Sequence, residues 1–160
     1  MLLPEMPEFL KQALEQLTGG PLWVTLLSVS VFAPLFEEWL CRGLVLRGLL
    51  QKLNPFSAIA VSAAFFAVLH MNPWQAIPAF LLGLLFGYVY YKTGSLKLTM
   101  LMHCVNNTLA AVTTRIPSLS EAETFMDILS PWAYVCIMVA SVLIICCSLL
   151  LIRGINRDVE

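Results

Sequence analysis

Long apolar tracts separated by short polar breaks dominate the chain. A helix needs about 20 apolar residues to cross the hydrocarbon core of a bilayer, so tract length and punctuation set the boundaries. The pairs Asn54-Pro55, Asn72-Pro73 and Thr93-Gly94 read as turns between tracts. The pattern predicts five membrane-spanning helices, over residues 21–53, 55–70, 74–91, 95–115 and 132–152.

The segment before the first apolar tract has a different pattern. Residues 4–18 mix charged and apolar positions, and Gly19, Gly20 and Pro21 close the segment. This pattern is typical of an amphipathic helix that lies at the membrane interface. We therefore expect an interfacial segment, a helix bundle, a non-cytoplasmic loop and a last transmembrane helix with a tail, at residues 1–20, 21–115, 116–130 and 131–160.

The composition agrees with a membrane protein and excludes a soluble domain. Of the 160 residues, 59% are hydrophobic and 12% are charged, with a mean hydropathy of +0.84. Soluble domains carry about 25% charged residues. The net charge of −1 gives no sign of a nucleic-acid surface. The fold class predicted is an all-α, polytopic transmembrane bundle.

Basic residues are unevenly distributed over the predicted connections. With five spans, two of the nine basic residues, Lys11 and Arg115, fall on one side of the membrane. The rest fall on the other side, and the positive-inside rule makes that side cytoplasmic. We therefore predict an external N-terminus and a cytoplasmic C-terminus. The basic residues on the cytoplasmic side are Arg42, Arg47, Lys52, Lys92, Lys97, Arg153 and Arg157.

Three ionisable residues lie within six positions of the first apolar tract. Each costs roughly 2.5–3.5 kcal/mol to insert at membrane depth, which favours a functional use. Glu38 and Arg42 have the i, i+4 spacing of a favourable helical pair, whereas Glu37 points about 100° away. Glu37 is then the acid available for chemistry. The alternative is an ordinary interfacial charge cluster.

Two histidines and an asparagine lie on later helices. In an antiparallel hairpin that turns at 53–54, Glu37 and His70 share one depth. His103 lies closer to its own turn, so it meets them only if the first hairpin projects about 10 Å farther. Asn107 shares a helix face with His103, and Asn106 is the neighbouring alternative. The alternatives are an interfacial histidine and hydrogen bonds that hold helices together.

These residues form three motifs whose order and spacing resemble a known family. They resemble the CPBP family of CAAX-processing and bacteriocin-processing intramembrane proteases, also described as Abi or lysostaphin-resistance-protein-A-like. The type II CAAX prenyl endopeptidase is its best-known member. The resemblance covers about residues 21–115. The motifs are Glu37-Glu38-x-x-x-Arg42, Phe66-x-x-x-His70 and His103-x-x-x-Asn107.

The resemblance implies a role for each motif residue. Glu37 would activate a water molecule, His70 would assist it, and His103 and Asn107 would stabilise the oxyanion. Metal-free catalysis by the glutamate is favoured, because asparagine is a poor zinc ligand and no H-E-x-x-H occurs. Zinc held by Glu37, His70 and His103 is the alternative cofactor, and the family has also been labelled metalloprotease. The supporting residues would be Glu38, Arg42 and Phe66.

The implied function is hydrolysis of a peptide bond in a membrane-associated peptide or protein tail, of the CAAX or leader-peptide type. The expected partners are the bilayer and a peptide substrate, either prenylated or a bacteriocin or signalling peptide. The expected location is a bacterial plasma membrane. Two other classes stay open: an ion- or proton-coupled transporter, since intramembrane ionisable residues also mark ion pathways, and a non-catalytic scaffold or immunity protein.

Overall fold

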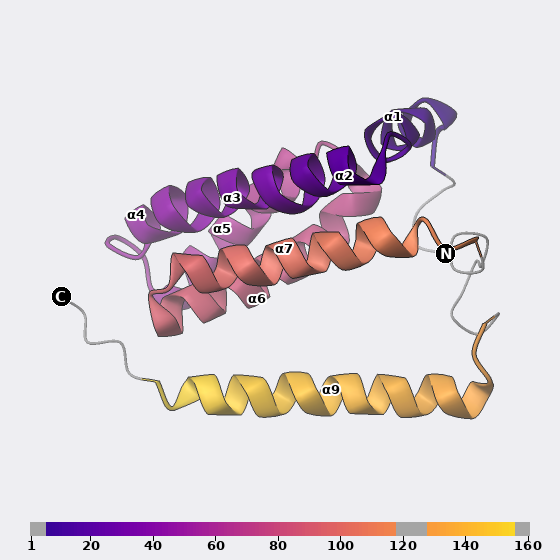
Figure 1. Ribbon diagram of the computed structural model, residues 1–160. Coiled ribbons are helices and arrows are strands. Elements are labelled where there is room, and N and C mark those ends of the chain that lie inside the picture. The colour runs from indigo at the N-terminus through magenta and orange to yellow at the C-terminus, as the bar shows by residue number, and fades with distance from the viewer. Residues whose placement is uncertain (1–5, 118–127, 156–160) are drawn as a thin grey trace.

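The computed structural model describes residues 6–117 and 128–155, and within these ranges the secondary structure is helical with no strand (Figure 1). The all-α fold class is therefore confirmed. Most of the predicted 116–130 loop lies outside the described residues. The amphipathic segment forms α1 (Glu8–Thr18), which begins later than predicted.

The first apolar tract forms one continuous helix over Leu22–Leu49 that changes register along its length. Two stretches adopt the wider π-helical geometry, in which a backbone N–H reaches back five residues instead of four. Such stretches are rare and often mark functional sites. The consecutive segments are α2 (Leu22–Thr25), η1 (Leu26–Phe32), α3 (Ala33–Glu38), η2 (Trp39–Leu46) and α4 (Arg47–Leu49).

The other apolar tracts form one helix each, with ends close to the predicted ones. Side-chain caps explain the boundaries: Asn54 accepts the Ser57 N–H at 3.0 Å, and Asn72 accepts the Trp74 N–H at 3.0 Å. Gly94 ends a helix with φ 66°, a left-handed conformation that glycine adopts without strain. The helices are α5 (Pro55–Leu69), α6 (Pro73–Thr93), α7 (Leu96–Thr113) and α9 (Pro131–Arg153).

Length and hydropathy identify fewer spans than the five predicted. Three helices are long and apolar enough to cross a membrane: Leu22–Leu49, Pro73–Thr93 and Pro131–Arg153. The α5 helix is apolar but has only 15 residues, and α7 carries polar side chains at several positions. The five-span topology and its orientation stay predictions.

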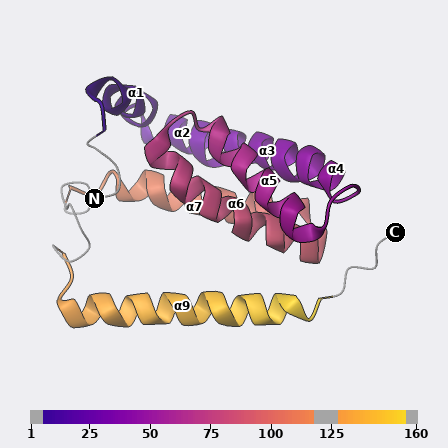
Figure 2. The same cartoon turned by 180° about the vertical axis from the view of Figure 1, so that it is seen from behind.

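Successive helices run antiparallel and form a bundle in which α7 lies beside the first helix, while α9 lies apart beneath α6 (Figures 1 and 2). The turn between α4 and α5 extends beyond the turn between α6 and α7 (Figure 1). This offset is the one that His103 needs to reach the depth of the acidic pair.

The closest packing in the bundle is between α5 and α6. The spacing Gly83-x-x-x-Gly87 predicts a small-residue stripe that lets another helix approach. A Cβ atom on Gly83 would lie 2.9 Å from the Cα of Ala63, and one on Gly87 would lie 3.0 Å from Ile59 Cγ2. Gly83 is therefore needed for this approach, whereas a side chain at Gly87 would require the Ile59 side chain to shift.

The α9 helix contributes no buried residue. A groove of about 630 Å³ separates part of it from α6, lined by Leu84, Leu85 and Tyr88 on one side and Leu149 and Leu150 on the other. The bundle core therefore forms without α9.

Candidate active site

The two acidic residues of the first helix occupy different environments. The Glu38 Oε1 accepts a hydrogen bond from Arg42 Nη1 at 2.7 Å, and both side chains are fully buried. Glu37 keeps 26% of its side chain exposed and has no hydrogen-bonded partner for its buried Oε2 among the described residues. Arg42 therefore serves Glu38, and Glu37 is left accessible.

Arg42 also ties the first helix to its neighbours. Its Nη2 donates to the Gly83 carbonyl at 3.0 Å. Its guanidinium carbon lies 4.7 Å from the ring centre of Phe66 and 5.5 Å from that of Phe86, within the range of cation–π attraction. One side chain thus contacts a carboxylate, a backbone carbonyl and two aromatic rings drawn from three helical segments.

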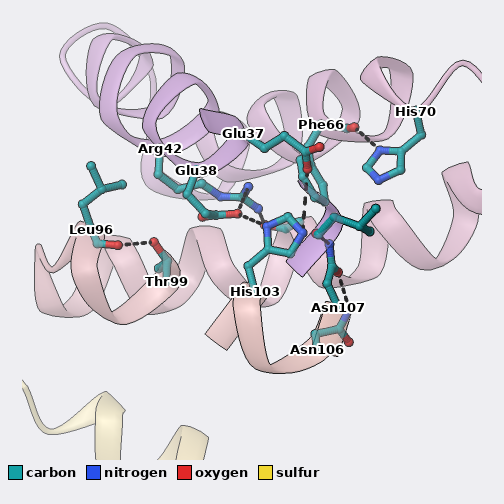
Figure 3. Close-up of polar contacts among 12 residues, drawn as sticks. Glu37, Glu38, Arg42, Phe66, His70, Leu96, Thr99, His103, Asn106 and Asn107 are labelled. Atoms are coloured by element: carbon teal, nitrogen blue, oxygen red, sulfur yellow. Dashed lines mark hydrogen bonds and ion pairs between the residues drawn. The ribbon is translucent and has the colours of Figure 1, made fainter. Parts of the chain in front are cut away.

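The ring of His103 lies between the two carboxylates (Figure 3). Its Nδ1 is 3.1 Å from Glu38 Oε1, and its Nε2 is 3.7 Å from Glu37 Oε2. A carboxylate paired with Arg42 is ionised and can only accept, so Nδ1 carries the donated hydrogen. The Nε2 is then the nitrogen that faces Glu37, at a separation longer than a direct hydrogen bond.

His70 lies at the end of α5 with its ring beside Phe66. Its Nδ1 donates to the Phe66 carbonyl at 2.9 Å, and the Phe66 ring meets the rings of both His70 and His103 edge to face, at 5.0 and 5.4 Å. Because Nδ1 is engaged with the carbonyl, Nε2 of His70 is the nitrogen left for reaction. Cys41 and Phe66 share one core cluster. Glu37 and His70 each lie one helical turn beyond that cluster.

Asn107 contacts the backbone of the first helix at Val29 rather than the Glu37 side chain. Its Nδ2 donates to the Val29 carbonyl at 2.9 Å, and its Oδ1 accepts from Asn106 Nδ2 at 3.2 Å. His103 and Asn107 are one turn apart on α7 (Figure 3). The candidate site therefore draws Glu37 from the first helix and both His103 and Asn107 from α7, with Phe66 linking His70 to His103.

The three residues considered as zinc ligands, Glu37, His70 and His103, do not form one metal-binding group. In the described part of the chain, no three His, Cys, Asp or Glu side chains form a group that could hold a metal ion. Glu37 and His103 approach each other, but His70 does not complete the set.

The wide register of the first helix is a feature of the site that the sequence analysis did not predict. In each π-helical segment a side chain of another helix donates a hydrogen bond to a backbone carbonyl. Asn107 Nδ2 donates to the Val29 carbonyl in η1, and Ser62 Oγ donates to the Cys41 carbonyl at 2.9 Å in η2. The sequence signal that could have indicated the first of these is Pro34, which lacks an N–H.

Comparison with known proteins gives one match. The chain matches the family of type II CAAX prenyl endopeptidases, Rce1-like, over residues 19–109, which is more than half of its length. The matched region includes the Glu37, His70, His103 and Asn107 positions. No curated protein and no solved structure matches the chain. The chain therefore belongs to the Rce1-like family of type II CAAX prenyl endopeptidases, a family of membrane proteases.

Proposed function

We propose that this protein hydrolyses a peptide bond near the end of a prenylated peptide or protein tail at the membrane, with water as the nucleophile and Glu37 as the base. Leader peptides are the second substrate class to be tested. The observation that best supports the proposal is the approach of Glu37 Oε2 and His103 Nε2 to 3.7 Å inside the bundle.

The environment of Glu37 suits a general base. Arg42 is bound to Glu38, so this cation does not hold the Glu37 carboxylate. The buried Oε2 has no hydrogen bond within the described residues, which leaves lone pairs for a proton taken from water. His70 offers its Nε2 to orient that water, because its Nδ1 is held by the Phe66 carbonyl.

The reaction proceeds in two steps. Glu37 takes a proton from water while the water oxygen forms a bond with the scissile carbonyl carbon, which gives a tetrahedral oxyanion. The C–N bond then breaks, the carbonyl re-forms, and the leaving nitrogen takes the proton from Glu37. The products are a carboxylic acid and an amine, with water consumed.

Two donors on α7 would stabilise the oxyanion. When its ring carries both protons, His103 donates through Nδ1 to Glu38 and through Nε2 to the oxyanion. Asn107 supplies an amide N–H one turn away. Once Glu37 is neutralised by the proton, the charges of Glu38 and Arg42 cancel, and the imidazolium balances the oxyanion.

The test uses the full chain reconstituted in liposomes with a library of farnesylated and leader peptides, with products identified by mass spectrometry. We expect cleavage by the wild type. Glu37→Gln should slow cleavage by about 10²–10⁴-fold and His103→Ala by about 10²–10³-fold. Glu8→Gln is the matched control, because the same chemical change falls on an exposed side chain of α1. Unchanged cleavage in both site variants refutes the proposal.

A further inference from the structure

We propose that the Asn107 side-chain amide is clamped in one orientation by two partners, the Val29 carbonyl and Asn106, and that Pro34 creates the clamp by leaving that carbonyl without a backbone donor. Asn106, Val29 and Pro34 are then positioning residues. The inference rests on the proposed function, in which Asn107 donates to the oxyanion.

The Val29 carbonyl is released by the local register of the first helix. In η1 (Leu26–Phe32) the Ala33 N–H donates to the Ser28 carbonyl, a step of five residues. Ala33 is the residue that would serve Val29 in an α-helix, so that donor is already engaged. The five-residue step from Val29 leads to Pro34, which has no N–H. Neither the four-residue nor the five-residue donor of its own helix therefore serves the Val29 carbonyl.

Asn107 provides that donor across the helix interface. Its Nδ2 lies 2.9 Å from the Val29 oxygen, and the two residues are far apart in sequence. This bond is partly buried, and satisfying a carbonyl removed from water stabilises the contact between α7 and the first helix. Asn107 thus satisfies a group that Pro34 leaves unsatisfied.

The Val29 carbonyl fixes which way round the Asn107 amide lies, because it can only accept, and the oxygen of that amide is held by Asn106. The Asn106 Nδ2 donates to Asn107 Oδ1 at 3.2 Å. The reversed amide would direct Oδ1 at the Val29 oxygen, so that bond would be replaced by a repulsive contact between two acceptors. Only one orientation of Asn107 satisfies both partners (Figure 3).

The clamp engages the oxygen and one of the two N–H hydrogens of the Asn107 amide. An amide group has one oxygen and two N–H hydrogens. Asn106 occupies the oxygen and Val29 occupies one hydrogen, which leaves a single N–H for an incoming group. A donor held before the reaction stabilises developing charge without reorganising at that moment. The clamp therefore prepares Asn107 for the oxyanion.

The kinetic test compares two clamp variants with a neighbouring control on the farnesylated peptide that the wild type cleaves. Asn106→Leu removes the bond to the amide oxygen, and Pro34→Ala restores a backbone N–H that competes for the freed carbonyl. We expect each to lower kcat about tenfold with KM within twofold, less than the roughly 10²–10³-fold for loss of a whole donor. Thr108→Val should leave both constants unchanged, because its hydroxyl bonds to the Cys104 carbonyl of its own helix.

A thioamide substitution at the scissile carbonyl separates positioning from a general structural defect. Sulfur accepts hydrogen bonds weakly, so the wild type should cleave the oxo peptide faster than the thio peptide, and this ratio should shrink in Asn106→Leu and Pro34→Ala. A wild-type kcat in both variants overturns the clamp. So does a fall in kcat that leaves the oxo-to-thio ratio unchanged.

A second measurement does not depend on cleavage. In micelles, protein labelled with ¹⁵N-asparagine should give an Asn107 side-chain amide, assigned with Asn107→Asp, in which one hydrogen exchanges with solvent more slowly than the other. That difference should vanish in Pro34→Ala, whose new backbone N–H competes for the Val29 carbonyl, and shrink in Asn106→Leu, which frees the amide oxygen. Equal exchange of both hydrogens in the wild type overturns the clamp. Slow exchange in a wild type that cleaves no peptide instead overturns the proposed function and leaves the clamp as a structural bond.

Discussion

Replacing Arg42 with methionine tests whether the buried ion pair holds the bundle together. The change keeps an apolar stem of similar length but removes the 2.7 Å bond to Glu38, the 3.0 Å bond to the Gly83 carbonyl and the contact with the Phe66 ring. It leaves Glu38 as a fully buried carboxylate without its main partner. Breaking one side of a buried pair costs about 3–5 kcal/mol of unfolding free energy.

The size of the loss comes mainly from the charge that stays behind. Glu38→Gln should cost a similar amount, about 3–5 kcal/mol, because it leaves the Arg42 charge buried against the Gly83 carbonyl and the Phe66 ring. The double variant removes both charges, so its cost should be smaller than the sum of the single costs. We expect a coupling energy of about 1–3 kcal/mol, in the range seen for residues in direct contact.

The assay is equilibrium unfolding in mixed micelles, followed by far-ultraviolet circular dichroism. Lys11→Met is the control, because Lys11 makes a 2.9 Å pair with Glu8 on the exposed surface of α1. Its cost should stay at about 0–1 kcal/mol. Strictly additive costs for Glu38 and Arg42, or an Arg42→Met protein as stable as the wild type, would refute this interpretation.

The remaining predictions concern packing, topology and metal use. A Cβ at Gly83 would lie 2.9 Å from the α5 backbone, whereas one at Gly48 meets nothing within 4 Å. In the same assay, Gly83→Ala should lower the free energy of unfolding by about 1–3 kcal/mol, and Gly48→Ala should not lower it. Equal effects of the two substitutions would contradict the close approach of α5 and α6. In a chain without its native cysteines, Lys97→Cys should react with an impermeant maleimide only from the cytoplasmic side and Ile128→Cys only from outside; external labelling of Lys97→Cys would instead favour three spans. The rate of cleavage should change less than twofold when a strong zinc chelator is added. Metal analysis should show less than one zinc ion per chain in both the purified wild type and His70→Ala. A rate that falls with chelator and returns with added zinc would contradict metal-free catalysis.

Helix positions could be predicted because the turns carry their own signals. Asn54 and Asn72 each stand directly before a proline, and in the structure each accepts a backbone N–H at the start of the next helix. Gly94 adopts the left-handed conformation expected just beyond a helix end. The first helix ends at Leu49 rather than at residue 53, because the chain turns before the Asn54 cap instead of running straight to it.

Within the site, contacts along one helix could be predicted and contacts between helices could not. The i, i+4 spacing correctly assigns Arg42 to Glu38 and leaves Glu37 without that cation. The second partner of Glu38, the Nδ1 of His103, depends on how far α7 slides along the first helix, which no local pattern encodes. The bond from Asn107 to Val29 also depends on the position of α7, although Pro34 marks in the sequence the carbonyl that loses its backbone donor.

The unburied surface of α9 makes the surrounding lipid part of the tertiary structure. Since no residue of this helix is buried against the bundle and a groove of about 630 Å³ runs between it and α6, we expect acyl chains to supply contacts that protein supplies elsewhere. Extraction into detergent replaces those chains with molecules of another length and shape. We therefore expect bilayer thickness and the choice of detergent to change the position of α9 while leaving the Glu37–His103 geometry intact. The effect of the surrounding lipid or detergent should thus be confined to this one helix.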